Sequence, residues 1–251
     1  MNGQEYCRAV FAELFFPALE QHFPEILPRL SAGVIGRGSE VLGDHAFSRD
    51  HGWGPGSCKM FLPEADVKRC GNDIREKLAA PVPTEFHGVT TGKLIPDAIR
   101  VATIDSVYAE SFGMIHPPDN LDAWYTSDSN NLCFAHSGAV IYDPSGALTA
   151  RQDAFRKAYY PDDIWKCRLA EKLWPIWHYG DYNRDRMLNR SDRVGLLVAQ
   201  GHCVDDVMNL VCLLNRRFPI YWKWLHWQFK QLPNWAPQLE LQLQELASTS
   251  R

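Results

Sequence analysis

The chain has 251 residues, of which 45% are hydrophobic and 22% charged, and its formal net charge is −4. This composition is typical of a globular protein with a sizeable core and argues against extensive disorder. The slight acidity also argues against a general nucleic-acid binder, because such proteins usually have a surplus of basic residues.

The cysteines and the apolar runs indicate the cellular compartment in which the protein is expected. Seven cysteines are scattered along the chain and never occur as C-x-x-C, so we expect free thiols in a reducing environment and little chance of a zinc site. No apolar run approaches the roughly 20 residues of a membrane span. We therefore expect a soluble, cytoplasmic protein with no membrane partner.

The first part of the chain mixes helical and strand patterns. Apolar residues recur at helical spacing from Gln4 to His22, with a kink expected at Pro17. The run 32–36 is short, apolar and ends in glycine, which predicts a buried strand that leads into a tight turn. Residues 57–62 predict a second strand, followed by a helix that begins at Pro63.

Two further strands are expected before the pattern changes. Residues 98–104 and 138–148 are the best candidates, and an Asp-Pro-Ser-Gly turn closes the second. From 149 onward only helical spacing is found, with N-caps expected at Asp162, Ser191 and Asp192. The sequence thus predicts a mixed-sheet α/β domain at 1–148 and an all-helical domain at 149–251.

The run 35–55, "IGRGSEVLGDHAFSRDHGWGP", combines glycines, serines and acidic residues. It fails the dinucleotide pattern G-x-G-x-x-G, because Gly36 and Gly38 are followed by Val41. It also lacks the Gly-Lys-Ser/Thr of a Walker loop, the G-x-S-x-G of a hydrolase elbow and the zinc motifs of a deaminase.

What remains is a strand, then Gly38-Ser39, ten intervening residues, and Asp50 at the start of another expected strand. This arrangement resembles the signature of the nucleotidyltransferase superfamily, which has the polymerase-beta-like fold. The resemblance implies that Gly38 and Ser39 let the backbone and a hydroxyl approach the phosphates of a nucleotide. It also implies that Asp50 holds Mg²⁺, or Mn²⁺ in its place, against the same phosphates.

The resemblance extends over nearly the whole chain. The segments "SRDHGWGP", "GAVIYDPSGALTARQDAF", "YYPDDIW" and "LLNRRFPIYWKW" are similar to a bacterial family that is known only as a domain of unknown function. Its members join a nucleotidyltransferase-like domain to a helical one, in a layout that resembles kanamycin nucleotidyltransferase. The "SRDHGWGP" run is the most distinctive of these segments.

The position of the second metal carboxylate is Gly52. Side chains alternate along a strand, so position 52 faces the same side as Asp50, and there the superfamily has Asp or Glu. Three interpretations follow. In the first, a carboxylate from another strand, Asp105 or Glu85, completes the metal site. In the second, the domain binds a nucleotide without transferring it. In the third, the Asp-His pairs 44–45 and 50–51 form a different, hydrolytic metal site.

Simpler structural roles compete with these interpretations. Asp105 is also placed to cap the helix that follows it, which we favour over a metal role. The Gly-Ser pair is compatible with an ordinary turn, and His51 with a packed residue beside Trp53. The distinctive context of Asp50 favours the functional interpretation for that residue.

The helical half offers cations for the triphosphate. Arg216, Arg217 and Lys223 lie close together in "NRRFPIYWKW". Two explanations for this cluster of cations are equally good: they bind phosphate, or they are solvated residues at a helix terminus that oppose the helix dipole. Asp162 and Asp163 start a helix, and we favour capping by Asp162 over a role as catalytic base.

The sequence favours a metal-dependent transfer of a nucleoside monophosphate from a nucleoside triphosphate to a small acceptor. The predicted site comprises Asp50 as catalytic and metal residue, Asp105 as second metal ligand, and Gly38, Ser39, Arg216 and Lys223 on the nucleotide. The alternative is a catalytically silent nucleotide-binding module or an antitoxin-like interaction module. The acceptor, the nucleobase and the oligomeric state are left open.

Overall fold

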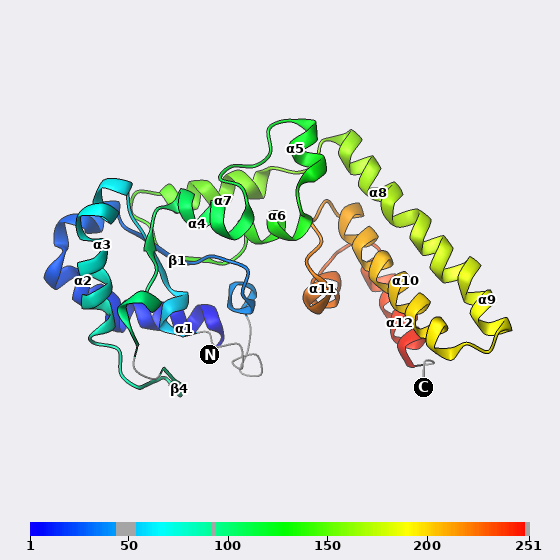
Figure 1. Cartoon of the computed structure of the whole chain (residues 1–251), viewed down its shortest axis with the longest axis horizontal. Helices are drawn as coiled ribbons and strands as arrows, with labels where there is room; N and C mark the ends of the chain where they lie inside the picture. Colours follow the sequence, from blue (N-terminus) through cyan, green and yellow to red (C-terminus); the bar gives the residue numbers. More distant parts are fainter. Residues whose placement is uncertain (44–53, 92–93, 249–251) are drawn as a thin grey trace. The chain divides into compact units, whose positions relative to one another are not determined.

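A computed structural model describes residues 1–43, 54–91 and 94–248 of the chain (Figure 1). The residues form two compact units, one made of 1–117 and 134–158 and the other of 118–133 and 159–251. The first unit contains a mixed sheet with helices, and the second is mostly helical, which confirms the predicted fold class. The predicted domain boundary at 148/149 stays a prediction, and it falls within one helix of the first unit.

A four-stranded mixed sheet lies at the centre of the first unit, in the order β5-β2-β1-β6. Strand β1 is antiparallel to both of its neighbours, β2 and β6, whereas β5 is parallel to β2. All four residues of β1 are buried, as expected for a central strand. The strands of this sheet are β1 (Ser31–Val34), β2 (Lys59–Phe61), β5 (Val101–Ala102) and β6 (Ala139–Tyr142).

The N-terminal helical segment precedes the sheet. It consists of α1 (Gly3–Ala9), η1 (Val10–Phe15), α2 (Phe16–His22) and the 3₁₀ segment η2 (Pro24–Arg29). The predicted helix is confirmed, but a π-helical stretch at η1 replaces the expected proline kink. The N–H of Phe16 donates to the carbonyl of Phe11, five residues back, just before Pro17.

Three longer helices surround the sheet. Helix α3 begins right after Pro63, as predicted, and α7 packs so closely on β1 that a Cβ at Gly33 would lie 3.1 Å from Leu148. Tyr108 of α4 stacks on Phe155 of α7 at a centroid distance of 5.6 Å. These helices are α3 (Glu64–Ala79), α4 (Ile104–Phe112) and α7 (Ala147–Lys157).

Short elements complete the first unit. A two-stranded antiparallel sheet joins β3 and β4, and three 3₁₀ turns connect the strands. The expected strand at 98–104 is reduced to two residues because a 3₁₀ turn precedes it and Thr103 already caps α4. These elements are β3 (Glu85–Phe86), β4 (Val89–Thr90), η3 (Ser39–Leu42), η5 (Pro55–Ser57) and η6 (Pro96–Ala98).

The second unit is built around the pair α8 and α10, which run antiparallel side by side in Figure 1. The Nζ of Lys172 lies 2.8 Å from the carboxylate of Asp206 and ties the two helices together. Asp192 caps α10 as predicted, whereas Asp162 follows the N-cap Pro161 and lies in the first turn of α8. The helices are α8 (Asp162–Trp177), η7 (His178–Tyr182), α9 (Asn183–Asn189), α10 (Arg193–Leu214), α11 (Trp222–Phe229) and α12 (Ala236–Ser248).

Two short helices, α5 (Leu121–Thr126) and α6 (Ser129–Ala135), precede β6 in the chain. In the part of the chain that the structure describes, α10 alone is long and apolar enough to cross a membrane by length and composition. The part of α10 that meets this test is 28% buried, and α10 contacts α8, α9 and α11. The cytoplasmic, membrane-free localisation stays a prediction.

Candidate functional site

The predicted Gly-Ser pair lies in the turn that follows the central strand. After β1, Ile35 is fully buried and Gly36 has a φ of +149°, which favours glycine. Gly38 is the N-cap of η3, and Ser39, its first residue, is only 7% exposed. The sequence therefore predicted the position of this turn at the end of a buried strand correctly.

Lys59, which sequence reasoning did not single out, reaches into the same turn. It lies opposite Gly33 in the β1–β2 register, and its Nζ donates a hydrogen bond to the carbonyl of Ile35. A Cβ added at Gly36 would lie 2.9 Å from this Nζ. Glycine at position 36 thus gives the ammonium group room beside the backbone of the turn.

The electrostatic environment of Lys59 is unusual for a lysine. The side chain is partly buried, and burial lowers the pKa of its ammonium group, while the nearby carboxylate of Glu40 opposes that shift. Burial costs the charged form free energy that an exposed lysine does not lose. The sequence did indicate that this lysine is unusual, because Lys59 interrupts the otherwise apolar run "SCKMFL".

Helix α1 holds the turn in place. A Cβ at Gly3 would lie 2.6 Å from the Cβ of Glu40, so the first turn of α1 packs directly on η3. Gln4 donates from Nε2 to the carbonyl of Val41 at 2.6 Å. Burial, together with Glu40, raises the pKa of the Cys7 thiol beneath this contact to about 12, so that Cys7 is a neutral thiol at physiological pH.

A cavity of about 580 Å³ opens beside the turn. Glu40 and Lys59 line it, together with small residues of η5 that include Gly56 and Ser57. A Cβ at Gly56 would lie 2.4 Å from the carbonyl oxygen of Ala98, so only glycine fits this wall of the cavity. The cavity therefore combines one cation, one carboxylate and several closely packed backbone segments.

Asp50, the central residue of the sequence prediction, lies outside the described residues, and so do Gly52 and the Asp-His pairs 44–45 and 50–51. Among residues 1–43, 54–91 and 94–248, no three His, Cys, Asp or Glu side chains are grouped as a metal site. Glu40 is the one described carboxylate that lines the cavity. The described residues by themselves therefore do not fit a Mg²⁺ or Mn²⁺ site.

The structure does not bring Asp105 to the Gly38-Ser39 turn. Strand β5 is parallel to β2, and β2 is antiparallel to β1, so the residues after β5 lie at the end of the sheet where β1 begins. The carboxylate of Asp105 there pairs with Arg151 at 2.6 Å. The N-cap of α4 is Thr103, and Asp105 lies in the first turn, so the capping role expected for Asp105 belongs to Thr103.

Glu85, the other candidate for a second carboxylate, lies closer to the cavity. It is exposed in β3 and pairs with Thr90 of β4, which lines the cavity. The topology thus favours Glu85 over Asp105 as a neighbour of the turn, whereas the sequence prediction chose Asp105 as the second metal ligand.

The predicted cations of the helical half belong to the second unit. The guanidinium of Arg216 lies 3.7 Å from the centre of the Trp165 ring and 3.2 Å from the carboxylate of Asp162, so aromatic and acidic groups already bind it. Lys223 is an exposed residue of α11. Each unit is described by itself, and a shared role with Gly38 and Ser39 stays a prediction.

The chain contains one match to a known family. Residues 124–225 match a family described as "Domain of unknown function (DUF4037)". The match covers less than half of the chain and includes residues of both compact units. No curated protein and no solved structure matches the chain.

Proposed function

We propose that the first unit is a nucleotidyltransferase-like domain that binds the phosphates of a nucleoside triphosphate at the turn 36–39. One observation carries the proposal, namely the partly buried ammonium of Lys59 at a glycine-rich turn beside a cavity. Phosphate oxygens are strong acceptors for such a group, and glycines allow a close approach of the backbone.

The energetics of Lys59 support a functional role. Burial lowers the pKa of its ammonium, which means that the folded protein disfavours the charged form. An apolar side chain of similar length at this position would avoid that penalty. Charged groups with perturbed pKa values in clefts are concentrated at functional sites. An anionic ligand that neutralises the charge would remove the penalty.

The reaction that we propose is metal-dependent transfer of a nucleoside monophosphate to a small acceptor. Asp50 would be the ligand of Mg²⁺, which when bound would neutralise charge on the phosphates. Glu40 and Glu85 are the described carboxylates nearest to this role. In the same proposal the protein is cytoplasmic and has no membrane or general nucleic-acid partner.

A second candidate function is favoured by two observations. Gly52 has no side chain where a second metal carboxylate belongs, and the described residues contain no metal cluster. A protein that binds the nucleotide but has lost its transfer chemistry fits both facts. This silent module would act through its nucleotide-bound state, for instance on a protein partner.

Turnover of nucleoside triphosphates with Mg²⁺ distinguishes the two candidates. If the protein is a transferase, Asp50→Ala should reduce turnover by about 100-fold or more, because a metal ligand is removed. Asp73→Ala, at an exposed position of α3, is the matched control and should retain full turnover.

The variant Gly52→Asp tests the silent alternative. If the missing carboxylate is the defect, Gly52→Asp should create or greatly raise Mg²⁺-dependent turnover. If wild type turns over triphosphate and Asp50→Ala leaves that rate unchanged, the proposed reaction is wrong.

A further inference from the structure

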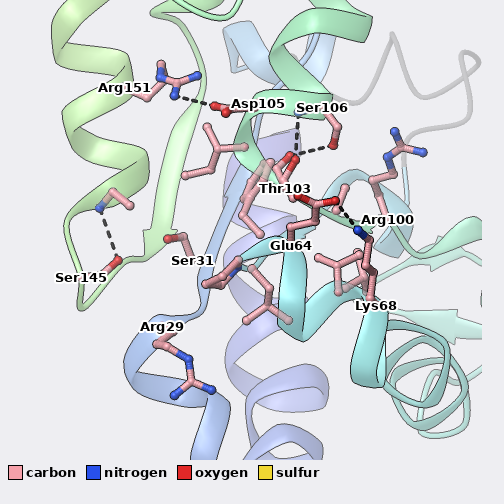
Figure 2. Close-up of a pocket in the computed structure, with 18 of the residues that line it drawn as sticks. Arg29, Ser31, Glu64, Lys68, Arg100, Thr103, Asp105, Ser106, Ser145 and Arg151 are labelled. Carbon is pink, nitrogen blue, oxygen red and sulfur yellow. Dashed lines mark hydrogen bonds and ion pairs between the residues drawn. The ribbon is translucent and has the colours of Figure 1, made fainter.

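A second, larger cavity of about 920 Å³ lies at the other end of the central sheet, where β2 and β5 end (Figure 2). Its lining comes from η2, β1, β2, α3, β5, α4 and α7 and the segments beside them, all in the first unit. Because β1 and β2 are antiparallel, this cavity and the turn after β1 lie at opposite ends of the sheet. It is therefore a separate site.

The lining of this cavity is rich in positive charge. Five cationic side chains line it and only two carboxylates, Glu64 and Asp105, so the lining has a surplus of three positive charges. Figure 2 shows labelled cations on several sides of the cavity, with Arg29 at the end of η2, Arg100 just before β5 and Arg151 on α7. The cationic residues are Arg29, Lys68, Arg75, Arg100 and Arg151.

These cations differ in how far neighbouring acids neutralise them. Two of the cations pair with the carboxylates of the lining, Arg151 with Asp105 and Lys68 with Glu64. Two others pair with carboxylates outside the lining, Arg29 with Asp66 and Arg100 with Glu110. Arg75 donates only to neutral oxygens, Asn72 Oδ1 at 2.6 Å and the carbonyl of Val101 at 3.0 Å. Within the described parts of the chain, Arg75 forms no ion pair.

Three helices begin at this cavity, and in the first turns of α4 and α7 Thr103 and Asp143 already accept backbone hydrogen bonds. The helices are α3 with 16 residues, α4 with 9 and α7 with 11. The first residue of each lines the cavity, namely Glu64, Ile104 and Ala147. No side chain caps the N-terminus of α3. Helix N-termini present free N–H groups and a partial positive charge, which favours anions.

The base of the cavity is apolar. Phe61, Leu62, Val101 and Ala102 come from the ends of β2 and β5, and Ile104 continues them. These strand-end side chains are almost fully buried, whereas Val67 and Ile104 of the same lining are half-buried and keep apolar surface open to a ligand. A phosphate that carries an organic group would cover that surface. The cavity, at about 920 Å³, is many times larger than an inorganic anion.

We propose that this cavity binds a small organic phosphate, independently of the nucleotide site at the turn. The phosphate group would lie among Lys68, Arg75 and Arg100, on the side of the cavity where α3 faces β5. The organic group would pack beside Val67 and Ile104. Neither Lys59 nor the Gly38-Ser39 turn takes part.

Amide NMR shifts locate the binding of three probes: inorganic phosphate, AMP and glucose 6-phosphate. We expect at least one organic phosphate to shift the amides of Ile104 and Ser106 saturably, and to bind more tightly than inorganic phosphate. Adenosine and glucose, which lack the phosphate, should not shift them. If no probe perturbs these amides, or if the neutral compounds bind equally well, the proposal is wrong.

Matched variants test the cationic residues. The double variant Lys68→Met/Arg100→Met should weaken binding roughly tenfold, since two charged contacts are removed. The side chains of Lys68 and Arg100 are 74% and 42% exposed, so the double variant should fold. If the double variant does not fold, the single variant Lys68→Met is used for the binding measurement. Lys77→Met/Lys157→Met, on α3 and α7 outside the lining, removes the same charge and should bind like wild type.

Lys59→Met separates this proposal from the nucleotide site. In this variant the ATP-induced shifts at Gly36 and Ser39 should need about tenfold more ATP or higher, whereas the shifts that the organic phosphate causes at Ile104 and Ser106 should keep the wild-type affinity. If the double variant and the control pair lose affinity equally, only the net charge matters and the proposed cavity is not the site.

Discussion

At the scale of single residues, Lys59 distinguishes the site most clearly from an ordinary strand-to-turn connection. Its ammonium donates to the carbonyl of Ile35, and burial lowers its pKa. A structural lysine would be expected to stabilise the fold. A functional lysine at such a position should contribute little stability, because desolvation offsets its hydrogen bond.

Lys59→Met should therefore change the free energy of unfolding at pH 7 by only about 1 kcal/mol in either direction. The folded pKa lies below the unfolded value near 10.5, so the unfolded chain holds this proton more tightly. Wild type should gain stability relative to Lys59→Met as pH rises from that lowered pKa toward 10.5. Urea unfolding of both proteins at several pH values checks the sign. A loss of relative stability over this window would show that the charge is not disfavoured in the fold.

Gly36 is the second residue with a specific requirement. Its φ of +149° is one that side chains of L-residues rarely adopt, and a Cβ would displace the Nζ of Lys59. Gly36→Ala should cost about 1–3 kcal/mol of unfolding free energy through backbone strain. Gly54→Ala is the control, since Gly54 has an extended φ of −162° and open space around its Cα. That variant should stay within about 0.5 kcal/mol of wild type in urea unfolding. Equal effects of the two variants would contradict the account of the turn.

At the scale of elements, an ion-pair network joins η2 to α3. Asp66 of α3 accepts from Arg29 at 2.9 Å and from Arg69 at 2.8 Å, and its side chain is only 9% exposed. The hydrogen bond from Arg29, followed by that from Arg69, lowers the pKa of the Asp66 carboxyl. This contact fixes the segment that leads into β1.

Asp66→Asn should destabilise the protein by about 1–2 kcal/mol at pH 7. The lowered pKa means that the stabilisation is present above the unfolded value near 3.8 and disappears as pH falls through the folded value. Thermal unfolding of wild type and Asp66→Asn should accordingly converge in strong acid. The exposed pair of Glu64 and Lys68 on the same helix is the comparison, and Glu64→Gln should leave the stability nearly unchanged. If the difference in stability between wild type and Asp66→Asn does not depend on pH, the charged pair is not the cause of that difference.

Much of this element pattern could be predicted from the sequence. Proline at 63, the glycine after the 32–36 run and the cap at Asp192 are local signals, and each element begins or ends where they indicate. The π-helical stretch at η1 could not be predicted, because it leaves the helical spacing of apolar residues nearly unchanged. The contact of Gly3 with Glu40 joins segments far apart in sequence, so no local pattern indicates it.

At the scale of the whole molecule, the sequence predicted the mixed sheet and the helical region correctly but could not group the candidate residues. It took Asp105 as a partner of Asp50 from its position after a strand. Only the strand directions show that Asp105 lies at the end of the sheet opposite the Gly38-Ser39 turn. The first unit thus has two cavities at opposite sheet ends, one beside Lys59 and one lined by cations.

The central claim is that the turn 36–39, with Lys59, binds the phosphates of a nucleoside triphosphate. The most direct measurement is an ATP titration with Mg²⁺ that follows the amide shifts of Gly36 and Ser39. We predict saturable shifts in wild type and Lys77→Met, and binding weaker by about tenfold or more in Lys59→Met, since a charged contact is lost. Absence of these shifts in wild type, or equal affinity in Lys59→Met, would contradict the claim.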